Sequence, residues 1–216
     1  MRPDIVINGI SMNDMGWLRE SISFPTPKSQ SNTIVVPGRN TPIRYTEALG
    51  RVSYQPRTFQ MVFTMHGLRA DFNRMEKEVA NLFSGVLSKV VTSEEPELYV
   101  VGTLEVTPSY DPLTHKGMVE ISCEDGDSYR YHKEETVVTF TGGGIVVLKN
   151  DYMPVIPTVK TTAETSLSWS VGTDEFRKTV SAGTWTFPEM ELFHGENTLT
   201  ISGMGTTTFS YREGCL

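Results

Sequence analysis

The stretch from residue 58 to residue 85 reads TFQMVFTMHGLRADFNRMEKEVANLFSG, and two different periodicities meet inside it. In Thr58–Met65 every second residue is apolar, and these residues are Phe59, Met61, Phe63 and Met65. Such alternation predicts a strand with one buried face. Further on, apolar residues recur at steps of three and four, which predicts an amphipathic helix over Arg69–Ser84. A strand followed by a helix in an otherwise strand-rich chain decides the fold class.

Residues typical of helix ends flank this predicted helix. Asp71 is the expected N-cap, and Gly85 suits the left-handed conformation that ends a helix. The polar face of the helix is mixed rather than basic. We therefore expect the apolar stripe to pack against a sheet and not against a membrane.

Strand patterns dominate the rest of the chain. In the N-terminal half, strand-like segments are expected at Asp4–Ile10, Trp17–Phe24, Thr33–Val36, Val86–Thr92, Leu98–Val106 and Gly117–Cys123. The connecting segments are expected at Asn8–Gly9, Pro25–Asn32, Ser93–Glu97 and Tyr110–Lys116. From Thr136 onward, apolar residues alternate with Ser or Thr and turn residues are frequent, which predicts a small β-sandwich. We place a domain boundary in the charged stretch before it, giving domains 1–133 and 134–216.

Two glycine-rich stretches lie between strand patterns near the C-terminus. Gly142-Gly143-Gly144 lacks the Lys-Ser/Thr of a phosphate-binding loop, and Gly203-Met204-Gly205 lacks the third glycine of a dinucleotide fingerprint. Both are predicted to be hairpin turns.

Composition excludes several classes of protein. The 216 residues are 38% hydrophobic and 21% charged, which is typical of a folded globular chain. The net charge of −7 argues against a broad nucleic-acid surface. No apolar stretch approaches the roughly 20 residues that span a bilayer, and Met1–Ser11 does not resemble a signal peptide. Cys123 and Cys215 are expected to be reduced thiols of a protein made in the cytoplasm.

No motif supplies a catalytic mechanism, a cofactor site or a metal site. The four histidines are dispersed without ligand spacing, and no serine lies in a nucleophile motif. Glu124-Asp125-Gly126-Asp127 is rich in carboxylates but lacks the pattern of a calcium loop. Arginines recur at Arg39, Arg44, Arg51 and Arg57, where a solvated face is the simplest interpretation. We therefore expect a protein that is not an enzyme.

Several strings resemble the distal tail protein family of long-tailed phages. In the N-terminal half these are Val36-Pro37-Gly38-Arg39-Asn40, then Tyr54-Gln55-Pro56-Arg57 before a strand, the predicted helix, and the strand Tyr99–Leu104 with its Gly102. At the other end Gly195-Glu196-Asn197 resembles a turn before the penultimate strand, and Phe209–Leu216 is similar to the closing strand. Thr41-Pro42 and Pro56 depart from the family pattern, so the path of the loop after Arg39 is expected to differ.

This resemblance implies a mainly β fold with two domains. The first is a ring-forming belt domain, a β-sandwich with one α-helix and a β-hairpin, and the second is a galectin-like β-sandwich. It also implies a virion protein at the tail tip or baseplate, made in the bacterial cytoplasm and not inserted in a membrane. Such proteins form a homohexameric ring that connects the tail tube protein to a tail-associated hub or fibre protein, with DNA only in transit through the channel. The candidate assembly loop comprises Pro37, Gly38, Arg39 and Asn40, together with Arg57.

Further expectations concern the surfaces of such a ring. The loops Pro25–Asn32 and Glu94–Pro96 are candidates for reaching a neighbouring subunit, and the acidic excess is expected to line the channel. The main alternative is a carbohydrate-binding β-sandwich module, free or attached to a cell-wall hydrolase. A tail-tube subunit is a further alternative within the structural class. Trp169 and Trp185 lack the sugar-binding strings of galectins and are both predicted to be core residues.

Overall fold

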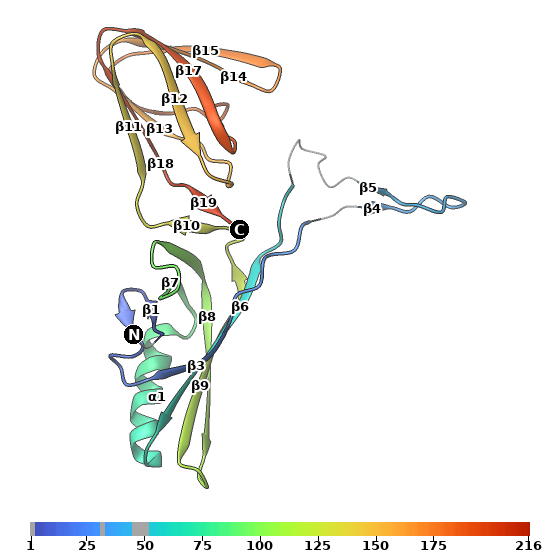
Figure 1. Ribbon diagram of the computed structural model, residues 1–216, viewed down its shortest axis with the longest axis vertical. Coiled ribbons are helices and arrows are strands. Elements are labelled where there is room, and N and C mark those ends of the chain that lie inside the picture. Colours follow the sequence, from blue (N-terminus) through green and yellow to red (C-terminus); the bar gives the residue numbers. More distant parts are fainter. Residues whose placement is uncertain (1–2, 31–32, 45–51) are drawn as a thin grey trace. The chain divides into compact units, whose positions relative to one another are not determined.

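The chain is mainly β and forms two compact units (Figure 1). The computed structural model describes residues 3–30, 33–44 and 52–216. Unit 1 comprises Met1–Arg130 and unit 2 comprises Tyr131–Leu216. This division falls just before the domain boundary expected from the sequence.

Seven strands of unit 1 follow one antiparallel path in the order β2-β1-β7-β8-β9-β6-β3. They are β1 (Ile5–Ile7), β2 (Ile10–Ser11), β3 (Leu18–Ser23), β6 (Arg57–His66), β7 (Val86–Thr92), β8 (Leu98–Asp111) and β9 (Lys116–Gly126). The first half of β8 pairs with β7 and its second half pairs with β9. Two further strands, β4 (Thr33–Ile34) and β5 (Ile43–Arg44), pair only with each other in the part of the chain that the structure describes.

The loop predicted at Tyr110–Lys116 is shorter than expected. Tyr110 pairs with Gly117 and Asp111 pairs with Lys116, so the strands continue on both sides. The Asp111 carboxylate closes the remaining turn by accepting hydrogen bonds from the Leu113 N–H at 2.9 Å and the Thr114 hydroxyl at 2.7 Å. A side chain that caps its own turn lets the ladder extend to the last residue before it.

Helix α1 (Arg69–Phe83) occupies the predicted position, but the predicted N-cap is wrong. Leu68 is the N-cap, and its carbonyl accepts the first helical hydrogen bond from Phe72 N–H at 3.1 Å. The first turn is therefore already closed around Asp71, whose carboxylate interacts with the positive end of the helix instead. At the other end, Gly85 has φ +73° as predicted, a conformation that favours glycine.

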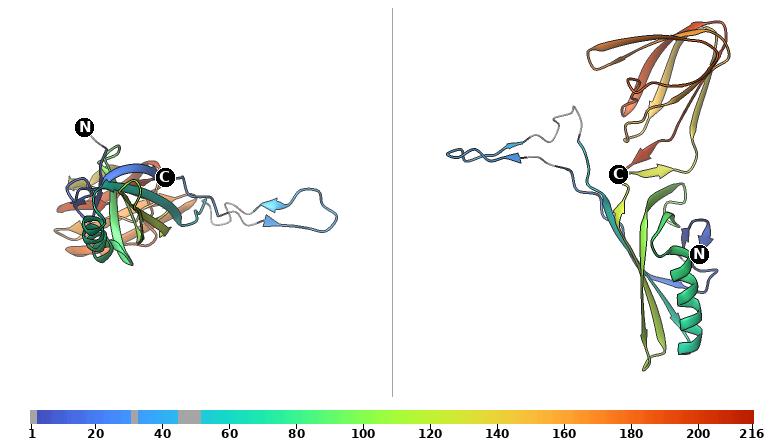
Figure 2. Two further views of the ribbon diagram at one scale, coloured as in Figure 1. Left: turned by 90° about the horizontal axis from the view of Figure 1, so that it is seen from below. Right: turned by 180° about the vertical axis from the view of Figure 1, so that it is seen from behind.

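Helix α1 lies along one face of the sheet (Figures 1 and 2), and side chains of the helix and the sheet together form the core of unit 1. The predicted alternation in β6 is confirmed, since Phe59, Met61, Phe63 and Met65 are all buried. Phe72 and Phe83 of α1 join them, and Trp17 packs edge-on against Phe72 with ring centroids 6.2 Å apart. Each such apolar side chain contributes about 1.5–3 kcal/mol when fully buried.

Unit 2 is a sandwich of two four-stranded antiparallel sheets, β11-β18-β13-β16 and β12-β17-β14-β15. The strands are β11 (Thr136–Thr141), β12 (Gly144–Asn150), β13 (Thr158–Thr161), β14 (Thr165–Val171), β15 (Asp174–Val180), β16 (Gly183–Thr186), β17 (Gly195–Gly203) and β18 (Thr206–Tyr211). The short strands β10 (Arg130–His132) and β19 (Gly214–Cys215) pair with each other. Inward-facing residues such as Leu148, Leu167 and Phe209 form the core.

Two turns of unit 2 differ from the prediction of hairpins. The turn after Thr141 leads from β11 in one sheet to β12 in the other, and the turn at Met204-Gly205 leads from β17 to β18 in the same way. At Gly144 a Cβ would lie 2.9 Å from the Phe140 ring, so glycine lets the chain cross tightly between the layers. Local turn chemistry identifies where the chain reverses, but not whether it reverses within a sheet or between sheets.

The two tryptophans predicted as core residues have different environments. Trp169 is buried, stacks on Phe176 at 5.7 Å and donates a hydrogen bond to the Glu189 carbonyl. The prediction for Trp185 is wrong, because its side chain remains 37% exposed on β16. Strand β16 is the edge of its sheet, so no further strand covers that side chain.

Candidate assembly surface

The predicted assembly loop is the connection between β4 and β5. Pro37, Gly38, Arg39 and Asn40 lie in this turn, where Arg39 N–H donates to the Val36 carbonyl at 3.1 Å and Gly38 has φ +81°. The turn follows a run of exposed apolar side chains, with Ile34 51%, Val35 78% and Val36 37% accessible. Three adjacent exposed β-branched side chains are unusual on a monomer surface, which makes this hairpin a candidate interaction site.

Arg57, the fifth predicted site residue, lies in a different element. It is the first residue of β6 and is only 2% exposed. Its guanidinium donates to the Pro25 carbonyl at 2.8 Å and to the Ser128 carbonyl at 3.0 Å. The structure therefore does not bring Arg57 to the loop; it places Arg57 inside unit 1.

These contacts tie together the two ends of the segment that carries the β4–β5 hairpin. Two backbone hydrogen bonds join the same two stretches of chain: Gln30 N–H donates to the Ser53 carbonyl at 2.7 Å, and Gln55 N–H donates to the Lys28 carbonyl at 2.9 Å. The Ser128 hydroxyl donates to the Gln55 carbonyl at 2.8 Å. We call residues 25–30 and 53–57 the base of the hairpin segment, and Arg57 holds it because a charged donor forms stronger hydrogen bonds than a neutral one. The rest of the predicted loop Pro25–Asn32 falls partly outside the described residues.

A second surface feature is a groove of about 220 Å³ at the β7–β8 turn. Its apolar lining comes mainly from strands that are distant in sequence, namely Ile22 and Phe24, Val90, Leu98 and Val100. The remaining lining residues are Thr92, Glu94, Glu95, Tyr99 and Arg130. We call this feature the β7–β8 groove.

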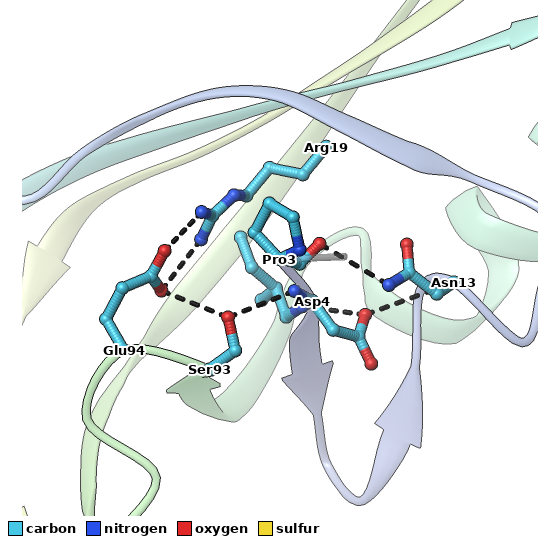
Figure 3. A network of polar contacts seen from close by, with 7 residues as sticks. Pro3, Asp4, Asn13, Arg19, Ser93 and Glu94 are labelled. Carbon is cyan, nitrogen blue, oxygen red and sulfur yellow. Dashed lines mark hydrogen bonds and ion pairs between the residues drawn. The ribbon is translucent and has the colours of Figure 1, made fainter. Parts of the chain in front are cut away.

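The other predicted reaching loop, Glu94–Pro96, forms the rim of this groove and is held by two ion pairs. Arg19 of β3 meets Glu94 with both terminal guanidinium nitrogens, one of them at 2.9 Å (Figure 3). Arg130 pairs with Glu95. Ser93 donates to Glu94 at 3.2 Å and accepts from Asp4 N–H at 3.1 Å, and Asp4 in turn accepts from Asn13 N–H (Figure 3). The hydrogen bonds from Arg19 lower the pKa of Glu94 to about 2. This turn is therefore fixed rather than extended.

The carboxylate-rich stretch after Cys123 has a structural role. Asp125 accepts hydrogen bonds from the Thr103 N–H at 2.8 Å and the Thr103 hydroxyl at 2.7 Å, and these bonds lower its pKa. Among the described residues, no group of three or more His, Cys, Asp and Glu side chains could hold a metal ion. None of the described helices combines the length and apolar character needed to cross a bilayer.

The remaining groups of chemical interest are the two cysteines and the histidines of unit 2. Neither Cys123 nor Cys215 forms a disulfide within the described part of the chain, and burial raises the pKa of the Cys123 thiol to about 12. In unit 2, Asp151 accepts from His132 Nε2 at 3.2 Å through its carboxylate, and its backbone carbonyl contacts His194 Nδ1 at 3.1 Å. The His194 ring stacks on Tyr152 at 4.5 Å, and Tyr152 is 59% exposed. This exposed aromatic pair gave no signal in the sequence, because its members are 42 positions apart.

Comparisons with known proteins identify the fold. No protein-family model matches the sequence, and no relative was found among curated proteins. Among solved structures, the chain is similar to the crystal structure of the SPP1 Dit (gp 19.1) protein, described as a paradigm of the hub adsorption apparatus in phages that infect Gram-positive bacteria. The TM-score is 0.73 at 15% sequence identity, and the match covers 100% of both chains. The fold predicted from the resemblance to distal tail proteins is therefore confirmed over the whole chain.

Proposed function

We propose that this chain is a structural protein at the tip of a long-tailed phage tail, where six copies form a ring. The observation that carries the proposal is the full-length similarity to SPP1 Dit, a protein described as part of a hub adsorption apparatus. Shared architecture over both units supports a shared role better than a match to one sandwich would. The low sequence identity means that function rests on this likeness together with the surfaces of the chain.

In this role the ring connects the tail tube protein to a tail-associated hub or fibre protein and leaves a channel for DNA. The protein performs no turnover, binds no cofactor and resides in the virion. The net charge of −7 supports an acidic lumen that repels DNA in transit. A ring structure with a basic lumen would overturn that part of the proposal.

Ring closure requires two different surfaces on each copy, because a head-to-tail contact that repeats by rotation is heterologous. The turn Pro37–Asn40 and the exposed apolar residues before it support a role of the β4–β5 hairpin as one of these surfaces. Arg57 contributes indirectly by holding the base of the hairpin segment.

Native mass spectrometry and negative-stain electron microscopy test the ring. We expect a species with six times the 24.1-kDa chain mass and a ring-shaped particle, for the protein alone or mixed with its tail tube protein. A protein that stays monomeric in both conditions, at concentrations up to 100 µM or so, would contradict the proposal.

The alternative, a carbohydrate-binding module, is favoured by one observation in unit 2. Tyr152 is exposed, and its ring is braced from behind by His194, which itself contacts the Asp151 carbonyl. A fixed exposed aromatic ring can stack on a sugar ring with little loss of entropy. A glycan array distinguishes the two functions. The control variant is Thr179→Ala, at another exposed position of unit 2. Glycan binding by a monomer that is lost in Tyr152→Ala and kept in Thr179→Ala would support the alternative.

A further inference from the structure

The β4–β5 hairpin combines apolar and basic character. Ile34, Val35 and Val36 are exposed, with Val35 reaching 78%. The segment Lys28–Arg44 contains three basic residues and no acidic residue, although the whole chain carries a net charge of −7. A partner surface that matches this hairpin would be an apolar groove with an acidic rim.

The β7–β8 groove has these properties. Its floor is formed by aliphatic and aromatic side chains, and its volume of about 220 Å³ equals that of about seven water molecules at ~30 Å³ each. The groove is thus large enough for two branched apolar side chains. The turn beside the groove contains three glutamates, Glu94, Glu95 and Glu97, and the first two line the groove.

The three glutamates are not equivalent. Glu94 and Glu95 are engaged by Arg19 and Arg130 within the same unit. Glu97 is exposed and forms no ion pair with any described residue. It is therefore the carboxylate of this turn that can receive a cation from another molecule.

We propose that the β4–β5 hairpin of one copy inserts Val35 and its apolar neighbours into the β7–β8 groove of a second copy, where Arg39 pairs with Glu97. This inference rests on the proposed ring and names the two halves of its contact. Hairpin and groove are different surfaces of one chain, so each copy donates one and accepts the other, as a closing ring requires. A single contact of this size is weak, and ring closure strengthens it because the last contact forms within one particle.

The two ion pairs at the rim have a defined role in this contact. Arg19–Glu94 and Arg130–Glu95 hold the turn in one conformation, so the groove is formed before the hairpin binds. A preformed site avoids the entropy cost of ordering the turn during assembly.

Mixed cross-linking tests the geometry. In a Cys215→Ser background, Val35→Cys in one preparation and Thr92→Cys in another are mixed and treated with a short bismaleimide under the conditions in which the ring forms. Because each protein carries only one introduced thiol, a Val35–Thr92 product joins two copies, and a hairpin bound to its own groove gives none. The matched control pairs Val35→Cys with Thr179→Cys on unit 2.

We expect at least tenfold more cross-linked dimer with Thr92→Cys than with Thr179→Cys. A hexamer that forms without this excess overturns the hairpin-in-groove contact but leaves the proposed function intact. Absence of any hexamer overturns both.

A charge exchange tests the Arg39–Glu97 pair. Arg39→Glu and Glu97→Arg should each raise the concentration needed for assembly roughly tenfold, as expected for loss of a close interfacial charge pair. The double variant Arg39→Glu/Glu97→Arg should restore assembly to within about threefold of the original protein. A double variant that is as defective as the two single variants combined would rule out the pairing.

Discussion

The β7–β8 turn and the β4–β5 hairpin both extend from strands of unit 1, and they are built in opposite ways. The turn has three glutamates, and two of them are held by arginines from other elements. The hairpin segment has three basic residues and exposed valines, and it is anchored at its base by Arg57. A fixed acidic turn beside an apolar groove is suited to receive a ligand, whereas an exposed basic-apolar hairpin is suited to enter a site. The sequence suggested a reaching role for Glu94–Pro96 and Pro25–Asn32 and an assembly role for Pro37–Asn40. The contacts distinguish a fixed turn beside a groove from an exposed hairpin.

The largest expected effect comes from the anchor of the hairpin segment. Arg57→Met removes the donor of two hydrogen bonds, so the partly buried Pro25 and Ser128 carbonyls lose that partner. We expect the free energy of unfolding to fall by about 2–4 kcal/mol, measured by urea denaturation. Arg39→Met at the exposed turn is the matched control and should change stability by less than about 0.5 kcal/mol. Equal effects of the two variants would contradict the distinction between base and tip.

The second-largest loss of stability is expected from a substitution in β8, the strand that follows the β7–β8 turn. At Gly102 of β8, an added Cβ would lie 2.3 Å from Cys123 Sγ and 2.9 Å from Gly126 Cα. Gly102→Ala should therefore destabilise the protein by about 1–3 kcal/mol through overpacking. The exposed β8 residue Thr107 provides the control, since Thr107→Ala should be nearly neutral. A neutral Gly102→Ala would show that β8 behind the groove is less tightly packed than described.

A smaller effect is expected from the ion pair on the turn itself. The pKa of Glu94 is about 2 in the folded protein and 4.5 ordinarily, so the pair stabilises the fold above about pH 5. That contribution is lost progressively as the pH falls from about 5 through 2, because Glu94 is then protonated in the folded as well as in the unfolded protein. Since the Glu94 side chain is 52% exposed, solvent screening limits the contribution to about 1 kcal/mol or less.

Glu94→Gln tests this contribution. The variant should lose less stability than the original protein between pH 5 and pH 2, as measured by thermal unfolding across that range. The exposed Glu196, whose Lys149 partner is 3.4 Å away, supplies the control variant Glu196→Gln with little change in the pH profile. Parallel pH profiles for all three proteins would contradict the assignment.

The smallest effect is chemical and leaves stability unchanged. Burial raises the pKa of Cys123 to about 12, and only the thiolate reacts with maleimide or disulfide reagents. In the folded protein at pH 8 we expect Cys215, which is half-buried, to be labelled first, and Cys123 to react only after unfolding. Mass mapping of the labelled peptides checks this. Prompt labelling of Cys123 would show that the packing around this residue of β9 opens readily.

Local sequence patterns predicted the elements of unit 1 well. The alternation in β6 and the three- and four-residue spacing in α1 each arise from burial of one face of a single element. Arg57 was grouped with exposed arginines, yet it lies two residues before Phe59 and so shares the buried face of β6. This two-residue spacing was a signal in the sequence, because a charged side chain on the apolar face of a strand needs hydrogen-bond partners there.

Features made by several elements were not predictable in this way. The β7–β8 groove needs Ile22, Val90 and Leu98 to meet, and no local pattern specifies that meeting. The same holds for Trp185, whose exposure depends on β16 being the last strand of its sheet. The turns that join β11 to β12 and β17 to β18 were recognised as turns, but the choice between one sheet and two is decided by which distant strands pair.

The crossing of those turns between layers affects how unit 2 acquires its structure. In that unit β14 and β15 are the only described neighbours in sequence that also pair, whereas β11 pairs with β18 and β12 with β17. A topology dominated by contacts between distant residues folds slowly, since long loops must close before any pairing can repay their entropy. Because β11 finds its partner only in β18, the first strand of the sandwich stays unpaired until nearly all of the unit has emerged from the ribosome. The seven-stranded path of unit 1 can form from residues made earlier, and only β19 (Gly214–Cys215), which pairs with β10, adds to that sheet from the end of the chain. The two units therefore gain most of their strand pairing at different times during synthesis.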